Sequence, residues 1–170
     1  HLINYTYPSD EDLARVGVTG LFLGYYIPWD GLSNAIISQA YGFRAYDKVV
    51  EGSMVSYENL DNHQTGIHDY FKFLKFGFGR ATDLACLHIR RGRLSRQDGL
   101  EVVKRLDGLF PWEYLGKTLE DILRPMDMTV EEFIRLCDRF TNKKIFQRST
   151  DGTLIKDRDG NLSKINEDNA

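Results

Sequence analysis

Residues 58–93 combine side chains with which a protein could bind anions and move protons. The stretch "ENLDNHQTGIHDYFKFLKFGFGRATD", residues 58–83, places carboxylates, amides, histidines and cations within an apolar pattern of helical period. Guanidinium groups bind phosphate and carboxylate through a planar fork of donors, and a histidine can exchange a proton near neutral pH. The stretch is therefore either a pair of capped core helices or one wall of an active site, and residue types alone leave both interpretations open.

A predicted helix over residues 80–91 carries three of these charged groups on one face. Arg80 and Asp83 lie three residues apart, and Arg90 falls near the same face. This face could bind an anion, although an intrahelical salt bridge exposed to solvent explains Arg80 and Asp83 equally well. Arg93 follows the helix end, where a cation also complements the helix dipole. Arg90 is thus a stronger site candidate than Arg93.

The segments before this helix offer a proton-transfer group and hydrogen-bonding loops. His68 and Asp69 lie off the apolar stripe, so the histidine could act as a general acid or base, although a surface pair at a helix start is more common. The loop "ENLDN", residues 58–62, can either cap a helix or bind sugar hydroxyl groups. Gly77 and Gly79 leave backbone N–H groups free to hold an anion, but a plain turn between helices is the commoner use of such glycines.

Local patterns predict the elements that position these groups. The near-continuous apolar run "VTGLFLGYY", residues 18–26, predicts a strand buried on both faces, and residues 53–57 form a weaker extended segment. The tail alternates polar and apolar residues around a "DG" turn, which predicts a hairpin. Helices, with their capping and stop signals, are predicted over residues 10–16, 31–42, from 64 onward, 80–91, from Ser95 to Gly108, from Thr118 to Pro125, and after the Thr129–Glu132 capping box.

These elements predict an α/β fold that is incomplete within the chain. One strong strand is too little for a parallel sheet, because a strand buried on both faces needs neighbours. We expect part of a Rossmann-like α/β layer at residues 1–57, a mainly helical region at residues 58–147, and a tail at residues 148–170 that forms a hairpin. The missing half of the layer is expected upstream of His1, in a longer protein.

Composition excludes several classes of function. The chain has 170 residues and a net charge of −3, which gives no electrostatic basis for nucleic-acid binding. No apolar run reaches the roughly 18 residues that a membrane helix needs. Cys86 and Cys137 fall in apolar helical patterns, which predicts two buried thiols and a reducing, cytoplasmic location. Neither cysteine nor histidine spacing matches a metal site, so no metal ligands are predicted.

Long phrases of the sequence resemble one family. The stretches "YENLDNHQTGIHDYFKFLKFGFGRATD", "IRRGRLSRQDGLEVVKRLDG" and "MTVEEFIRLCDRFTNKKIF" are similar to the C-terminal part of N-acetyl sugar amidotransferases, members of the PP-loop ATP pyrophosphatase superfamily. The stretches "IPWDGLSNAIISQAYGF" and "DGNLSKIN" also fit, so the resemblance covers nearly the whole chain.

The resemblance implies an ATP-dependent reaction with Mg²⁺. ATP activates the amide oxygen of an acetamido sugar, and ammonia then converts the acetamido group to an acetamidino group. Glutamine supplies the ammonia through partner subunits similar to the histidine-pathway glutaminase and cyclase. The products enter bacterial surface polysaccharides such as lipopolysaccharide and its O-antigen. The superfamily's SGGxDS phosphate loop does not occur in these 170 residues, so this portion alone is expected to be inactive.

The resemblance also selects site residues, whose roles come from chemistry. Cations stabilise charge that develops on phosphate, which favours Lys75, Arg80 and Arg90. Asp83 could orient Arg80 or help to hold magnesium. The predicted catalytic residues are His68, Arg80 and Asp83. The predicted substrate- or nucleotide-binding residues are Asn59, Asp61, Asn62, Asp69, Lys75, Thr82, Arg90 and Arg93.

Two other functions fit the residues. The chain could be a noncatalytic helical module that docks the ammonia-supplying partner or forms a homo-oligomer, with the aromatic residues of 70–78 as the interface. It could instead belong to another PP-loop enzyme, such as a tRNA-modifying sulfurtransferase. The near-neutral charge and the absence of a paired thiol weigh against the sulfurtransferase.

Overall fold

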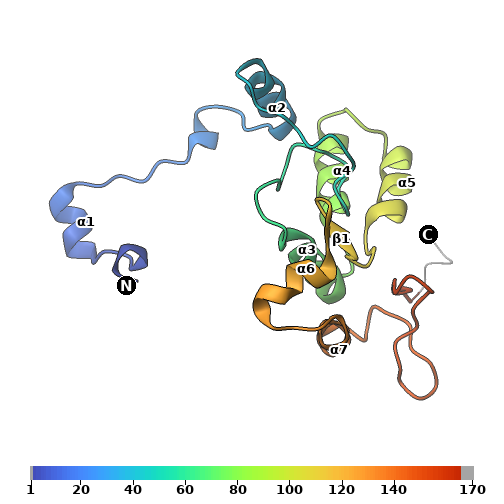
Figure 1. The fold of residues 1–170 in the computed structure, drawn as a ribbon. Helices are drawn as coiled ribbons and strands as arrows, with labels where there is room; N and C mark the ends of the chain where they lie inside the picture. Colours follow the sequence, from blue (N-terminus) through green and yellow to red (C-terminus); the bar gives the residue numbers. More distant parts are fainter. Residues whose placement is uncertain (1, 166–170) are drawn as a thin grey trace. The chain divides into compact units, whose positions relative to one another are not determined.

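The computed structural model describes residues 2–165, and the chain divides into two units. The first unit is His1–Tyr41 and the second is Gly42–Ala170. Figure 1 shows the ribbon coloured along the sequence. No helix within residues 2–165 is both long enough and apolar enough to cross a membrane.

The N-terminal unit contains short helices with local caps. The hydroxyl of Ser9 accepts a hydrogen bond from the backbone N–H of Asp12, and the carboxylate of Asp30 accepts one from Leu32. Both caps satisfy donors that a helix start leaves free, so the two predicted α-helices are confirmed. The elements are the 3₁₀-helix η1 (Ile3–Tyr5), α1 (Asp10–Val16), the 3₁₀-helix η2 (Leu23–Tyr25) and α2 (Gly31–Ala40).

The strand predicted over residues 18–26 is wrong. Residues 18–22 have no regular structure, and η2 follows them. The apolar side chains of this run are exposed rather than buried; Phe22 is 78% exposed and Tyr25 is 85% exposed. A strand needs a neighbour to pair its backbone groups, and residues 2–41 provide none. The weaker segment at residues 53–57 is also not a strand.

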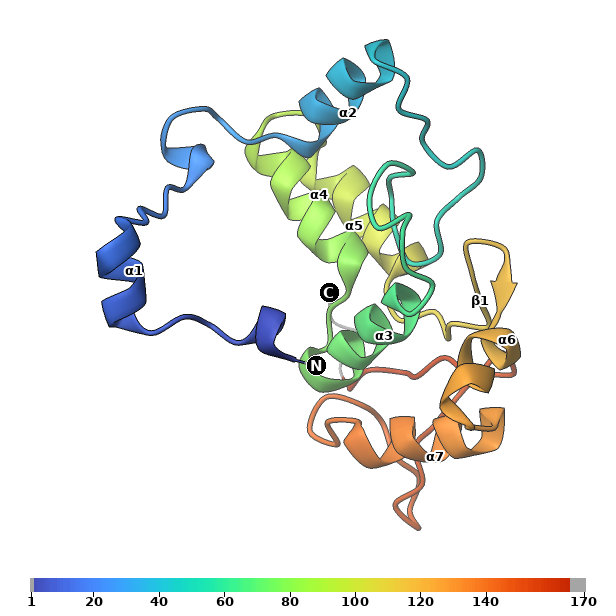
Figure 2. The ribbon, with the colours of Figure 1, turned by 60° about the vertical axis from the view of Figure 1, so that its left-hand side comes forward.

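The second unit is mainly helical, as predicted. Helix α4 packs on α5, and α3 and α6 both pack against α7 (Figures 1 and 2). The side chains of Ser95, Thr118 and Thr129 each accept a hydrogen bond from the backbone three residues on, which fixes three of the helix starts. The helices are α3 (Thr65–Phe76), α4 (Arg80–Arg90), α5 (Arg96–Leu106), α6 (Leu119–Leu123), the 3₁₀-helix η3 (Arg124–Met126) and α7 (Val130–Phe140).

The core of this unit lies between α3, α6, α7 and the tail. Leu74, Phe133 and Phe146 are among its fully buried side chains. Tyr70 and Phe73 also belong to this core, whereas Phe76 and Phe78 remain exposed. The aromatic residues of 70–78 therefore divide between the core and the surface, because a helix turns its residues to opposite faces.

The described strands are short and antiparallel. Strand β1 (Glu113–Tyr114) pairs with β2 (Lys117–Thr118) around Leu115 and Gly116, both of which have positive φ, as a tight hairpin turn requires. Sequence analysis did not predict this hairpin. In the tail, the predicted pairing takes the form of two successive turns with isolated bridges, Arg148 to Leu154 and Lys156 to Leu162. No parallel sheet occurs in the part of the chain that the structure describes.

Candidate functional site

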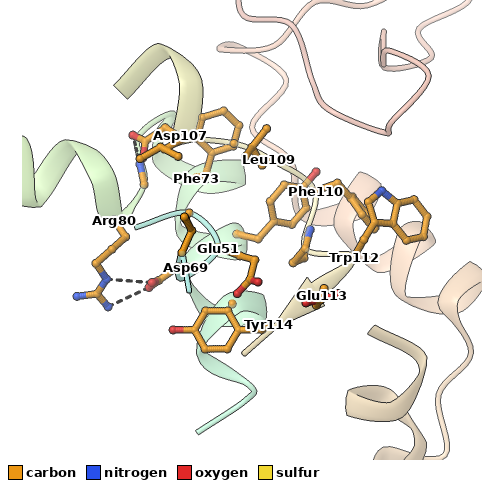
Figure 3. Close-up of a pocket in the computed structure, with 18 residues that line it drawn as sticks. Glu51, Asp69, Phe73, Arg80, Asp107, Leu109, Phe110, Trp112, Glu113 and Tyr114 are labelled. Carbon is orange, nitrogen blue, oxygen red and sulfur yellow. Dashed lines mark hydrogen bonds and ion pairs between the residues drawn. The ribbon is translucent and has the colours of Figure 1, made fainter. Parts of the chain in front are cut away.

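A cavity of about 310 Å³ opens within the second unit. Its walls come from α3, the start of α4, the segment at residues 49–52 and the loop at residues 106–114 (Figure 3). Phe73 and Phe110 provide apolar surface, and Asp69 with Arg80 stands at one end. The cavity has the size and the mostly apolar lining of a small-molecule site.

Arg80 and Asp69 form a paired unit at this end of the cavity. Arg80 Nε donates to Asp69 Oδ2 at 2.9 Å, and Arg80 Nη2 donates to Asp69 Oδ1 at 3.1 Å. Their side chains are only 27% and 16% exposed. Burial works against the charged guanidinium, but hydrogen bonding and the charge of Asp69 outweigh it, so the pKa of Arg80 is raised. Arg80 therefore stays charged, and its two hydrogen bonds to Asp69 hold the guanidinium in one orientation.

The side chain of Asp107 connects the loop at residues 106–114 to the start of α4 through hydrogen bonds. Its Oδ2 accepts hydrogen bonds from the backbone N–H of Gly79 at 2.8 Å and from Thr82 Oγ1 at 2.5 Å. Its Oδ1 accepts one from the backbone N–H of Ala81 at 3.0 Å. A carboxylate at a helix N-terminus satisfies free donors and complements the helix dipole. Asp107 thus uses the backbone N–H of Gly79, which sequence analysis considered as part of an anion site, so the glycines serve the turn between helices that was the favoured interpretation.

Glycines allow the cavity walls to approach closely. A Cβ at Gly66 would lie 2.6 Å from the ring of Tyr114, and one at Gly108 would lie 2.2 Å from the ring of Phe73. Gly108 also has φ of +83°, a conformation that side chains with a Cβ rarely adopt. Any larger residue at these two positions would push the loop at residues 106–114 away from α3.

Residues of the tail form hydrogen bonds with Phe110 and Trp112, the two residues that make the aromatic wall of the cavity. The backbone N–H of Phe110 donates to Asn161 Oδ1 at 2.7 Å, and Trp112 Nε1 donates to the carbonyl of Asp159 at 2.8 Å. The two rings lie with centroids 4.6 Å apart. In Figure 3, Trp112 stands at the opposite end of the site from Arg80, with Phe110 between them. The turn at residues 157–161 is therefore a structural support of the cavity.

Tyr114 lies at the lower side of the site in Figure 3, and Glu51 lies above it, near the centre. The Tyr114 hydroxyl donates to the carbonyl of Asn59 at 3.3 Å, and Glu51 Oε2 accepts from the backbone N–H of Leu115 at 3.0 Å. Burial, followed by the charge of Asp69, raises the pKa of Tyr114 to about 12. Tyr114 is therefore a neutral hydroxyl at physiological pH.

The structure brings several predicted site residues together. Asp69 and Arg80 line the cavity, and Thr82 reaches it through Asp107. His68 Nδ1 lies 3.1 Å from Asp69 Oδ1, while the histidine side chain is 77% exposed. His68 therefore lies at the surface, beside the Asp69–Arg80 pair.

Other predicted residues lie elsewhere. The suggestion that Asp83 orients Arg80 is corrected, since Asp69 does so and Asp83 pairs with Lys72. Arg90 ends α4, about 15 Å along the helix from Arg80 at 1.5 Å per residue. The ammonium of Lys75 lies 5.6 Å from the ring centre of Phe140, away from the cavity lining.

The remaining predicted site residues, Asn59, Asp61, Asn62 and Arg93, lie in the loops before α3 and after α4. Asn62 Oδ1 accepts from the backbone N–H of Gln64 at 2.8 Å, which orders the loop before α3. Asn59 has a positive φ of 57°, and Asp61 is exposed. Arg93 follows α4, and its backbone N–H donates to the carbonyl of His88. The Asn62 side chain therefore orders the loop before α3, but the N-cap residue of α3 is Gln64, which provides no side-chain cap, so the loop does not cap the helix.

Sequence reasoning missed much of the cavity. Asp107, Phe110 and Trp112 lie in "LDGLFPWEY", where a "DG" pair after a helix and a run of aromatic residues are visible signals. Those signals do not show that Asp107 contacts Gly79, 28 positions earlier. Glu51 has no comparable signal.

Two further features of the described residues concern possible metal ligands and the burial of the two cysteines. No cluster of three or more histidine, cysteine, aspartate or glutamate side chains within residues 2–165 could hold a metal ion. Cys137 is buried as predicted, and burial raises its pKa to about 12. Cys86 is exposed, so the prediction of a buried thiol there is wrong. It stands on the outer face of α4, beside the buried Leu84 and Ala85.

Comparison with known proteins identifies the family. Residues 43–158 match the family described as LPS biosynthesis protein WbpG-like, C-terminal domain. The match starts at the second unit and contains every protein segment that lines the cavity. No curated protein matches the chain. The chain belongs to the WbpG-like proteins of LPS biosynthesis, through their C-terminal domain.

Proposed function

We propose that this chain is the C-terminal portion of an ATP-dependent amidotransferase that converts the acetamido group of an N-acetyl sugar into an acetamidino group. The observation that carries the proposal is the Asp69–Arg80 pair at the end of the cavity, in a chain of an LPS biosynthesis family. LPS is built from modified sugars, and the sequence resemblance supplies the reaction. Glutamine-derived ammonia from glutaminase- and cyclase-like subunits would be the nitrogen source.

ATP would supply the activation of the amide oxygen, but the described residues do not fit its phosphates or Mg²⁺. The backbone N–H groups of Gly79 and Ala81 already donate to Asp107, and Arg80 already binds Asp69. No carboxylate cluster in the described range suits a metal ion. We assign the ATP side of the reaction to a phosphate loop outside this chain, in a Rossmann-like layer of the longer protein.

The residues of this chain would act on the sugar side. Arg80 presents an oriented guanidinium at one end of the cavity, where it can donate hydrogen bonds that position the sugar. His68 can take a proton from attacking ammonia and pass it to solvent, because it is exposed and lies beside Asp69. The other predicted residues would support the site from outside the cavity lining; they are Asn59, Asp61, Asn62, Lys75, Thr82, Asp83, Arg90 and Arg93.

The experiment combines the full-length protein that contains this chain with ATP, Mg²⁺, an ammonium salt and a nucleotide-linked N-acetyl sugar. Mass spectrometry of the sugar would detect replacement of the amide oxygen by nitrogen, and pyrophosphate release would report ATP use. The proposal requires both signals and their loss without ATP. Pyrophosphate release that depends on tRNA and not on the sugar would favour a tRNA-modifying enzyme instead.

Exposed apolar side chains in the N-terminal unit favour a second role, in association. Tyr5, Phe22 and Tyr41 are each more than three-quarters exposed. Soluble monomers rarely leave such a density of apolar side chains uncovered. We therefore propose that the chain forms homo-oligomers or docks a partner subunit through residues 2–41. Sedimentation showing a clean monomer, with no binding of an apolar dye, would contradict this.

A further inference from the structure

The cavity is acidic, which limits what it can bind. Its charged lining consists of four carboxylates, those of Glu51, Asp69, Asp107 and Glu113, against the single guanidinium of Arg80. Figure 3 shows Glu51 at the centre of the site, between Asp69 and Phe110. Like charges repel strongly in a partly dehydrated site. A phosphate group entering this cavity would therefore meet an unfavourable field.

Both features that could counter this field already have internal partners. A phosphate that bound Arg80 in bidentate fashion would displace Asp69 and leave a carboxylate that is 16% exposed without its partner. A phosphate at the start of α4 would displace Asp107, which holds two backbone N–H groups and the Thr82 hydroxyl. In either case, phosphate would take over hydrogen bonds that a carboxylate of the protein already makes. The displaced carboxylate would remain in the cavity as an additional negative charge.

The remaining lining suits an uncharged ring. Phe110 and Trp112 form an aromatic pair along one wall, and Trp112 is 49% exposed, so part of its ring is accessible. Carboxylates accept hydrogen bonds from hydroxyl groups. Among the described contacts of Glu51, Oε2 accepts from the backbone of Leu115, and no backbone group donates to Oε1. Apolar walls with a few fixed acceptors are typical of sites for small polar rings.

We propose that this cavity binds the uncharged ring of the acetamido sugar and keeps phosphate groups outside. The apolar face of the ring lies against Phe110 and Trp112, and its hydroxyl groups donate to Glu51. Its acetamido group is left outside the phosphate-excluding cavity, where ATP can activate the amide oxygen. The identity of the ring rests on the proposed function. The exclusion of phosphate rests only on the charges and contacts of the cavity.

The test uses Trp112 as a reporter in the whole chain. The sequence has two tryptophans, so Trp29→Phe leaves Trp112 alone. The probes are the methyl glycoside of N-acetylglucosamine, N-acetylglucosamine 6-phosphate and inorganic phosphate, read by fluorescence and by saturation-transfer NMR. We expect the neutral glycoside to bind about tenfold more tightly or better than its phosphorylated counterpart, which corresponds to about 1.4 kcal/mol.

Variants separate charge from structure. Glu51→Gln keeps an acceptor for the backbone N–H of Leu115 but removes one negative charge. It should therefore lower the ratio of affinities, neutral glycoside over phosphorylated sugar, at least severalfold. Trp112→Ala should weaken the neutral sugar, whereas Trp112→Phe should retain most of its affinity, both read by NMR. Glu101→Gln makes the same charge change on the exposed face of α5 and should leave the preference unchanged.

Three results would overturn the inference. They are equal or tighter binding of the phosphorylated sugar, no binding of the neutral glycoside at tens of millimolar, and an equal response of Glu51→Gln and Glu101→Gln. Failure of the amidination assay would be distinct, because these binding measurements need neither ATP nor ammonia. A chain that binds the neutral ring in a protein without amidotransferase activity would refute the proposed reaction and support the cavity's selectivity.

Discussion

Replacing Asp107 with asparagine should destabilise the chain far more than the loss of one charge suggests. Asparagine has the same shape but carries an NH₂ group in place of one carboxylate oxygen. In either orientation, that NH₂ faces a backbone N–H that now donates to Asp107, from Ala81 or from Gly79. One of these two N–H groups would lose its acceptor, and both residues are buried.

The magnitude follows from these contacts. A buried donor without a partner costs about 1–3 kcal/mol. Loss of the negative charge at the start of α4 adds roughly 0.3–1 kcal/mol. A decrease of about 2–3 kcal/mol in the free energy of unfolding should lower Tm by roughly 5–10 °C in a chain of this size.

Thermal unfolding followed by circular dichroism measures this effect, with Glu101→Gln as the control. Glu101 is exposed and accepts only from Gln97 among its described contacts, so its substitution should move Tm little. If Asp107→Asn and Glu101→Gln gave the same Tm within about 1 °C, the carboxylate would not be holding α4 to the loop.

Three further outcomes are expected. In the full-length protein, Arg80→Ala should lower turnover by roughly 10²-fold or more, and Arg80→Lys should restore little because lysine lacks the bidentate fork. Arg105→Ala is the control for that pair, and near-normal turnover of Arg80→Ala with a lowered Tm would show a purely structural role. Gly108→Ala should destabilise the chain much more than Gly152→Ala, since both glycines have positive φ but only Gly108 faces a ring at 2.2 Å; equal Tm values would refute the contact. The unfolded chain ionises the Cys137 thiol near pH 9, whereas the folded chain retains the proton up to about pH 12, so stability should fall across this window and fall less in Cys137→Ala, as denaturant titrations at several pH values would show.

The sequence alone determined the helices of this protein, because their signals are local. The caps at Ser95, Thr118 and Thr129 each join residues three positions apart, so the pattern that predicts them also contains all the atoms that form them. The same holds for the "DG" turns of the tail and for the apolar stripe that buries Tyr70 and Leu74.

Residue types also pointed to Asp69 and Arg80, but only the tertiary structure decided that they bind each other. The helical register offered Asp83 as the partner of Arg80, three positions away. The turn between α3 and α4 instead brings in Asp69 from eleven positions away. Asp107 and Trp112 entered the site in the same way, from a loop that sequence analysis left without a role.

The apolar run at residues 18–26 shows the opposite limit. Its composition favours a strand, but a strand is defined by hydrogen bonds to a neighbour, and the described N-terminal unit has no neighbouring strand to offer. A helix closes its backbone hydrogen bonds within its own segment, so its sequence can specify it. Strand pairing, a carboxylate that caps a distant helix and the charge balance of a cavity all depend on residues far apart in the chain, and only the folded structure determines which of them meet.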